Sequence, residues 1–210
     1  MISLEAVSFQ YRGAEKPIIK DLSCSFSPGE CVAVTGKNGC GKTTLIRLVT
    51  GMLRPQSGRI TIDGTDTASS DLCEIGRMAG CVFQDPSRQL FCQTVKDEIA
   101  YGLKNMGLSQ SETEEKCAEW MHFFRLEHLS GAFPGNLSQG EKQRVVLAAV
   151  LAMGTRYVLL DEPTSGLDMR AREELGSYLR RLANAGSGVV FVSHERNFID
   201  RFSTREQVMA

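Results

Sequence analysis

The sequence predicts an α/β protein with a parallel sheet as its body, an antiparallel β part at the amino end and an inserted helical segment. Three observations lead to this prediction. Apolar runs at 31–36, 157–162 and 188–194 alternate with helical patterns, which is typical of buried parallel strands. Residues 2–11 and 21–27 instead alternate between apolar and polar side chains, as antiparallel strands do. Strand patterns disappear between residues 85 and 136.

The amino-terminal strand contains an irregularity. Within ISLEAVSFQY at 2–11, the apolar residues Ile2 and Leu4 are followed, one residue out of step, by Val7 and Phe9. Because side chains of a strand alternate between two faces, this slip predicts a bulge or bend. Further strands are predicted at 21–27, 58–64 and 78–84, and a helix at 42–52 is expected to stop at Gly51.

The later part of the chain is predicted to return from helices to parallel strands. Helices are expected at 94–103 and 111–124, and the second carries Cys117, Trp120, Met121 and Phe124 on one face, which favours a packed core over a cofactor site. After them we predict, in order, a helix at 139–152, a strand at 157–162, a helix at 169–186 and a strand at 188–194.

Composition restricts the class of protein. The 210 residues carry a formal net charge of −1, so no general basic field attracts nucleic acid, and we expect no nucleic-acid partner. No apolar run approaches the roughly 18 residues of a membrane-spanning helix, and the amino end does not resemble a signal peptide. The seven cysteines form no C-x-x-C pair and are expected to be reduced, buried and cytoplasmic.

The stretch GKNGCGKT at 36–43 matches the pattern G-x-x-x-x-G-K-T/S between a buried strand and a helix. In this setting the glycines allow backbone N–H groups to surround phosphates, Lys42 supplies a positive charge, and the Thr43 hydroxyl is a ligand for Mg²⁺. A glycine-rich turn without function is the alternative. The expected nucleotide-binding residues of this loop are Gly36, Lys37, Asn38, Gly39, Cys40, Gly41, Lys42, Thr43 and Thr44.

Two carboxylates end the apolar strand at 157–162. We expect this strand to lie beside strand 31–36, where Asp161 can hold Mg²⁺. Glu162 then points elsewhere and can accept a proton from an attacking water. An acidic pair after a strand is by itself more often a loop start or a helix cap, but its combination with the phosphate loop favours catalysis.

A second anion-binding feature lies about a hundred residues further along, in LSQGEKQR at 137–144. Ser138 is expected to cap a helix, Glu141 completes a capping box, and Gly140 leaves backbone N–H groups uncovered. This helix start can therefore hold a negative group without a lysine. A self-contained capping box is the local alternative, and it is compatible with that role.

Together these features resemble the ATPase subunits of ATP-binding-cassette (ABC) transporters over nearly the whole chain. LSQGEKQR is close to the family signature LSGGQ, and PTSGLD at 163–168 follows Glu162 directly. The resemblance implies one ABC ATPase domain at 1–210 with the P-loop NTPase fold: a RecA-like parallel-sheet core, an antiparallel β subdomain and a helical subdomain inserted at about 85–136. It also implies ATP and Mg²⁺ as cofactors and hydrolysis of ATP.

The resemblance further implies a partner, a second ABC ATPase copy or paralogue packed head to tail. Each nucleotide would lie between the phosphate loop of one chain and the signature helix of the other. Ser138 and Gly140 would then meet a γ-phosphate held by the partner's Lys42. An isologous dimer of this kind makes two such sites.

Four more positions correspond to site residues of the family. Tyr11 resembles the aromatic residue that stacks on adenine, and Gln84 the loop glutamine that touches Mg²⁺ and the attacking water. His194 resembles the switch histidine that donates a hydrogen bond to the γ-phosphate. Asp168 resembles the aspartate that communicates across the dimer; it is also a candidate cap of the helix at 169–186, and both roles are compatible. An ordinary strand aromatic is the alternative for Tyr11.

The stretch QDPSRQLFCQTVKDEIAYGL at 84–103 resembles the energy-coupling-factor ATPases, which drive uptake of vitamins or of cobalt and nickel ions. The resemblance implies an integral membrane transporter subunit that docks near Gln84–Phe91, beside Gln89 and Leu90, and holds the chain on the inner face of the cell membrane. Packing of Leu90 and Phe91 under the helical insertion is the structural alternative. The functional alternatives are an exporter ATPase, a soluble ABC ATPase without transport, and a nucleotide-binding regulator without turnover.

Two features depart from the family pattern. Gln139 stands where glycine is usual and Glu141 where glutamine is usual, and both leave Ser138 and Gly140 intact. After His194 only sixteen residues remain. We therefore expect the carboxy-terminal strands and the dimerisation region of the family to be missing.

Overall fold

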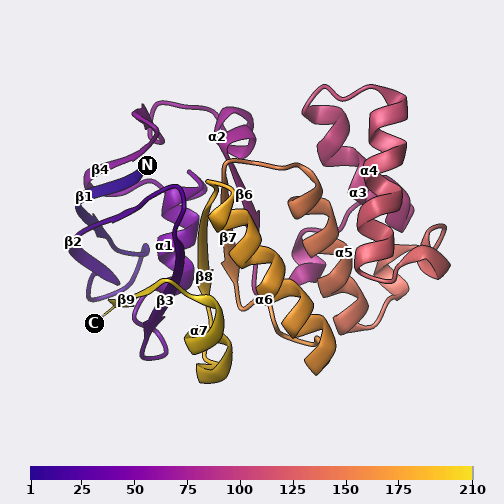
Figure 1. Ribbon diagram of the computed structural model, residues 1–210. Coiled ribbons are helices and arrows are strands. Elements are labelled where there is room, and N and C mark those ends of the chain that lie inside the picture. Colours follow the sequence, from indigo (N-terminus) through magenta and orange to yellow (C-terminus); the bar gives the residue numbers. More distant parts are fainter. Residues whose placement is uncertain (210) are drawn as a thin grey trace.

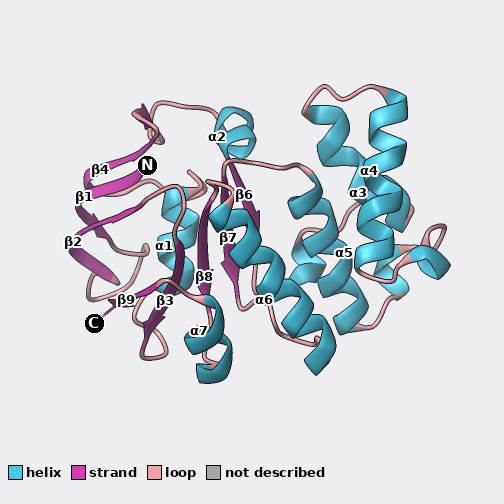
Figure 2. Cartoon of the chain, in the orientation of Figure 1, coloured by secondary structure: helices cyan, strands magenta, loops and turns pink. Residues whose placement is uncertain are grey.

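The computed structural model describes residues 1–209 and contains two sheets with helices around them (Figures 1 and 2). The antiparallel sheet has the strand order β2-β1-β4-β5, and the second sheet, whose strands all run parallel, has the order β6-β7-β8-β3-β9. The strands are β1 (Ile2–Phe9), β2 (Ile19–Phe26), β3 (Cys31–Gly36), β4 (Ser57–Ile62), β5 (Thr65–Asp66), β6 (Ala79–Val82), β7 (Tyr157–Asp161), β8 (Gly188–Val192) and β9 (Arg205–Met209).

Seven α-helices connect these strands within residues 1–209. They are α1 (Lys42–Val49), α2 (Leu72–Met78), α3 (Val95–Asn105), α4 (Gln110–Phe123), α5 (Gln139–Ala152), α6 (Met169–Asn184) and α7 (Arg196–Phe202), with short 3-10 turns at Pro86–Arg88, Glu127–Leu129 and Pro134–Asn136. Among these described residues, no helix combines the length and the apolar character that crossing a bilayer requires.

Two apolar cores follow from the alternation of side chains along the parallel strands. In β3, Val32 and Val34 face α1 and the antiparallel sheet, whereas Cys31 and Ala33 belong to the core under α5 and α6. Helix α1 lies between the two sheets (Figure 1). Because this helix is buried by both sheets, its first turn is held rigidly at the carboxyl edge of β3, where the phosphate loop ends.

The predicted bulge in the first strand is confirmed. The register of β1 against β2 shifts between Leu4 and Val7, and Ala6 takes a positive φ of 48°. The helical insertion is also confirmed, since residues 85–136 contain helices and turns but no strand. Helices α3 and α4 pack with α5 at one end of the molecule (Figure 1), and Cys117 and Trp120 are buried there as core residues, as predicted.

The structure corrects the predicted position of β7. This strand does not lie beside β3, because β8 pairs with both and separates them. Strand order depends on contacts across the sheet, which a local pattern of apolar residues does not encode. Asp161 nevertheless reaches the phosphate loop, because the first turn of α1 extends over the edge of the sheet toward β7.

The expectation that carboxy-terminal strands are missing is also wrong in part. Residues 205–209 form β9, which pairs in parallel with β3 from Val32 to Gly36. The run REQVM contains three polar residues and therefore gives no buried-strand pattern. Helix α2 and the short β5 were likewise not predicted.

The seven cysteines are all free thiols, but they are not all buried. Cys31 and Cys117 are buried, whereas Cys73 is exposed on α2, contrary to the expectation for it. Burial raises the pKa of the Cys31 thiol to about 12, so this side chain is a neutral core residue at physiological pH.

Candidate active site

The phosphate loop connects β3 to α1 through backbone conformations that require glycine. Gly36 has a φ of 146°, and a Cβ atom there would lie 2.5 Å from the carbonyl oxygen of Met209 in β9. Gly41, at the start of α1, has a φ of 100°. The buried Lys42 turns back over this loop, and its Nζ donates to the carbonyl oxygens of Gly36 at 2.9 Å and Lys37 at 3.0 Å. The ammonium group is therefore held over the concave side of the loop.

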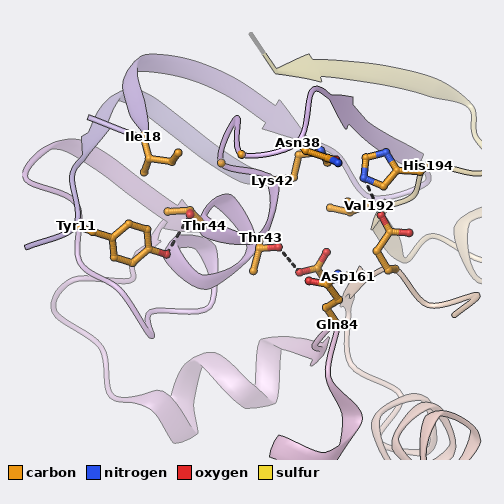
Figure 3. A pocket seen from close by; sticks show the side chains of 13 residues that line it. Tyr11, Ile18, Asn38, Lys42, Thr43, Thr44, Gln84, Asp161, Val192 and His194 are labelled. Carbon is orange, nitrogen blue, oxygen red and sulfur yellow. Dashed lines mark hydrogen bonds and ion pairs between the residues drawn. The ribbon is translucent and has the colours of Figure 1, made fainter. Parts of the chain in front are cut away.

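A hydroxyl and a carboxylate meet at the first turn of α1. The Oγ1 of Thr43 donates to Oδ2 of Asp161 at 2.6 Å (Figure 3), and Asp161 is buried at the end of β7. Burial raises the pKa of the Asp161 carboxyl, and this effect is opposed by the hydrogen bond from Thr43 and by the positive charges of Arg47 and Lys42. A buried carboxylate beside a hydroxyl is a suitable oxygen environment for a hard cation.

Glu162 follows at the turn after β7, with a strained positive φ of 51°. Its Oε1 is buried and accepts no hydrogen bond, although it lies 3.3 Å from Nε2 of His194, within ion-pair distance (Figure 3). Burial raises the pKa of the Glu162 carboxyl, the charge of His194 opposes that rise, and the nearby Asp161 adds to it. A raised pKa is the property that a general base working near neutral pH needs.

These side chains surround one cavity of about 490 Å³ (Figure 3). Tyr11 lies at one end of it, where its hydroxyl is 3.1 Å from Oγ1 of Thr44, and His194 lies at the other end. The predicted site residues that line the cavity are Tyr11, Asn38, Gly39, Gly41, Lys42, Thr43, Thr44, Gln84, Asp161, Glu162 and His194. A tyrosine ring, the glycine-rich loop and the Glu162 carboxylate thus line one cavity.

Six predicted residues are not among those lining this cavity. Gly36, Lys37 and Cys40 belong to the phosphate loop but do not line the cavity. Ser138, Gly140 and Asp168 lie elsewhere, and all three are at helix starts. Asp168 caps α6, its Oδ1 accepting from the N–H of Ala171 at 2.8 Å, which is its predicted structural role.

Ser138 forms the predicted capping box. Oε2 of Glu141 accepts from the backbone N–H of Ser138 at 2.8 Å, and the Ser138 hydroxyl accepts from the N–H of Glu141 at 3.4 Å. Gly140 lies against the loop after Glu162, since a Cβ atom there would be 2.5 Å from the carbonyl oxygen of Gly166. The signature helix therefore rests on backbone that leads directly from the general-base candidate.

The sequence missed some residues of the cavity. Ile18 and Val192 line it and were not predicted. Val192 ends the strand that leads to His194, so its position gave a usable signal, whereas Ile18 lies in a loop without a motif. Outside the cavity lining, the contact of Met209 with Gly36 was missed as well, because no pattern indicated that β9 would reach the phosphate loop.

Comparison with known proteins agrees with this geometry. Residues 19–165 match the family model described as ABC transporter. The energy-coupling factor transporter ATP-binding protein EcfA1 of Thermotoga maritima is 38% identical over 199 residues, which cover 95% of this chain and 74% of the relative.

Two solved structures superpose on nearly the whole chain. The ATP-binding cassette MJ0796, a dimer in a post-hydrolysis state bound to ADP and Pi, has a TM-score of 0.89 and 26% identity, with 100% of this chain and 94% of that chain covered. The cbiO1 protein of Clostridium perfringens, part of the ABC transporter complex cbiONQ, has a TM-score of 0.81 and 30% identity, with 99% and 84% covered. The chain therefore belongs to the ABC transporter family, as an ATP-binding subunit that hydrolyses ATP.

Proposed function

We propose that the chain powers an importer of the energy-coupling-factor type, working as one half of a head-to-tail ATPase dimer beneath a membrane subunit. The observation that carries the dimer is the separation of the two anion-binding features. The phosphate loop lines the cavity, whereas Ser138 and Gly140 do not. A second chain, supplying its own helix start, would complete each site.

Residues at different positions in the cavity have different roles in hydrolysis. Lys42 balances the charge of the outer phosphates, and the glycine-rich loop donates backbone N–H groups to them. Glu162 accepts the proton of the attacking water, because its pKa is raised and its Oε1 has no other hydrogen-bond donor. His194 donates to the γ-phosphate, and Tyr11 stacks on the base.

The oxygen-bearing side chains that surround the first turn of α1 are suitable ligands for Mg²⁺. Thr43, Asp161 and Gln84 supply only oxygen ligands at the cavity wall, which is what this ion prefers. Within the described chain, 1–209, no group of three or more His, Cys, Asp and Glu side chains forms a metal cage, so the protein would hold the ion together with phosphate oxygens. When bound, Mg²⁺ would neutralise charge on the transferred phosphoryl group.

Ser138→Ala tests the dimer. The substitution removes a cap and should lower stability by about 1 kcal/mol, yet monomer ATP binding should stay unchanged while hydrolysis falls. Ser109→Ala is a matched control, because Ser109 and Glu112 form the same capping box at the start of α4. It should cost similar stability and leave hydrolysis intact. Equal effects of the two variants on hydrolysis, or loss of ATP binding by the Ser138 variant, would contradict the shared site.

The membrane subunit is expected beside the loop at 85–93. Leu90 packs against the helical core, but Phe91 is 63% exposed and lies edge-on to Tyr101, with ring centroids 4.8 Å apart. Leu90 therefore follows the packing alternative, whereas Phe91 contacts the insertion through Tyr101 and leaves most of its side chain exposed. Beside the two rings, a cavity of about 150 Å³ opens between α3 and α5.

The loop at 85–93 is held by side-chain hydrogen bonds to its own backbone and to the segment before it. Gln89 bonds back to the preceding strand, accepting from the N–H of Phe83 at 2.7 Å and donating to the carbonyl oxygen of Cys81 at 2.9 Å. The buried Glu98 accepts from the N–H groups of Phe91 and Cys92 at 2.9 and 2.8 Å. A partner that binds Phe91 would therefore act on the same hydrogen-bonded loop that directly follows Gln84.

Co-purification with membranes tests this docking. We expect Phe91→Ser to reduce the amount of chain recovered with detergent-solubilised membrane protein while ATP binding persists. Val208→Ser is the control, since Val208 is 66% exposed on β9, at the opposite edge of the parallel sheet from β6, which leads into the loop at 85–93. Equal recovery of wild type and the Phe91 variant would contradict docking at this site and would favour a soluble ABC ATPase.

A further inference from the structure

One carboxylate connects the two loops that follow β7 and β8. Oε1 of Glu195 accepts from Oγ1 of Thr164 at 2.6 Å, and Oε2 accepts from Nη1 of Arg172 at 2.8 Å. Arg172 in turn donates through Nε to the carbonyl oxygen of Leu167 at 2.9 Å. Both oxygens of Glu195 are thus occupied by donors from the segment after Glu162.

Glu195 is placed at the start of α7 but does not cap that helix. Its side chain makes no capping hydrogen bond to the first turn of α7, whereas the residues before α2, α3, α4, α5 and α6 all do so. A carboxylate at a helix start ordinarily accepts from the second or third N–H of the helix. The side chain is instead directed toward the buried Thr164.

The two connected loops carry the reacting groups. His194 immediately precedes Glu195, and Glu162 lies two residues before Thr164. The two loops are joined where they leave their strands, since the N–H of Glu162 donates to the carbonyl oxygen of Val192 at 3.0 Å. The hydrogen bond between Glu195 and Thr164 joins the same two loops further along the chain. The 3.3 Å contact between His194 and Glu162 lies between these two connections.

The same segment also meets the signature helix. Gly166 lies between the two anchor points, Thr164 and Leu167, and its backbone packs on Gly140. The buried Gln143 of α5 donates to the carbonyl oxygen of Pro163 at 3.3 Å. The segment 163–168 therefore contacts both the His194 loop, through Glu195, and the start of α5.

We propose that Glu195 is a positioning residue for ATP hydrolysis: with Thr164 and Arg172 it holds His194 opposite Glu162 and links both to the signature helix. The inference rests on the proposed role of His194. It predicts a loss of turnover without a loss of nucleotide affinity, because Glu195 does not line the nucleotide cavity. The Glu195–Arg172 ion pair is partly exposed and adds little to stability. Loss of the Thr164 hydrogen bond costs more, because Thr164 is buried, but it is a single bond, so the variants should remain folded.

The experiment compares phosphate release by the full chain in Glu195 and Thr164 variants. We expect Glu195→Ala to lower kcat about tenfold, as misplacement of a catalytic group does, with an unchanged KM for ATP. Thr164→Val should act in the same direction, because it removes the donor while keeping the volume. Thr164→Ser keeps the hydroxyl and should restore turnover. Glu173→Ala is the control, since Glu173 pairs with Arg201 of α7 on the same face and makes no hydrogen bond to either loop.

A double-mutant cycle with His194 separates positioning from general destabilisation. If Glu195 acts through His194, adding Glu195→Ala to His194→Ala should lower kcat no further. Additive losses, wild-type kcat in Glu195→Ala, or a raised Kd for ATP would overturn the inference. Wild-type kcat in His194→Ala itself would remove the proposed role of His194 and this inference with it, so the two failures are distinguishable.

Discussion

Replacing Glu162 with glutamine should change turnover and stability in opposite directions. Glu162 carries a carboxylate whose Oε1 is buried without a hydrogen bond, on a residue with a strained φ of 51°. This arrangement is costly for the folded protein and useful only when a water molecule is there to be deprotonated. Glu162→Gln retains the shape of the side chain and removes both the charge and the basicity.

The expected magnitudes follow from these features. Loss of the general base should lower kcat by about 10²–10⁴ while ATP still binds. Removal of an unsatisfied buried carboxylate oxygen should stabilise the fold without nucleotide by about 1–2 kcal/mol, which corresponds to a rise in Tm of about 2–8 °C for a domain of this size. Glutamine can donate as well as accept, so it has more ways to satisfy this position.

The stability difference should also depend on pH with a definite sign. Because the pKa of Glu162 is raised in the folded state, its charged form destabilises the fold above that pKa. The cost disappears below the unfolded-state pKa, where the carboxyl is neutral in both states. The Tm advantage of Glu162→Gln should therefore be largest at pH 8 and shrink toward pH 4.

Thermal unfolding between pH 4 and 8 and phosphate release at pH 7.5 measure these effects. Glu115→Gln is a matched control, since Glu115 is exposed on α4 and should change neither quantity. A Glu162→Gln protein that hydrolyses ATP at the wild-type rate would remove Glu162 from the mechanism. A lower Tm at every pH would show that the carboxylate is stabilising, which would refute the electrostatic argument.

Two further substitutions test the phosphate loop and the signature helix. Lys42→Ala removes the buried ammonium and should weaken ATP binding at least about tenfold, as loss of a charge-assisted contact does; an unchanged Kd by calorimetry would contradict the role of the loop. Gly140→Ala should lower the Tm, because its Cβ would meet the carbonyl oxygen of Gly166 at 2.5 Å. Gly76→Ala in α2 meets nothing within 4 Å and should raise stability by about 0.5–1 kcal/mol. Equal shifts for the two glycines would contradict the close packing.

Short motifs were predictable because the residues that determine the conformation of each motif lie within a few positions of one another. The phosphate loop, the capping box at Ser138 and the bulge in β1 all have signals within a few residues. Their positions relative to one another had no such signal. The sequence indicated that Asp161 and Thr43 share a site, but it suggested neighbouring strands, whereas β8 lies between β7 and β3.

The missed features share a physical cause. Strand β9 is polar in three of its five residues, and it is a strand because the edge of β3 offers unpaired backbone groups, not because of its own side chains. The bridging role of Glu195 likewise depends on Thr164 and Arg172, which are 31 and 23 residues away along the chain. No spacing pattern connects such residues.

Residue order alone was sufficient to establish the fold class, the phosphate loop, the carboxylate pair and membership of the ABC ATPases, since these depend on local backbone geometry and on side-chain chemistry. Folding in three dimensions was needed to bring Glu162 and His194 to 3.3 Å, to bury a carboxylate oxygen of Glu162 without a hydrogen bond, and to pack Gly140 on Gly166. Those properties arise from burial and from contacts between distant segments, and both exist only when the whole chain is packed.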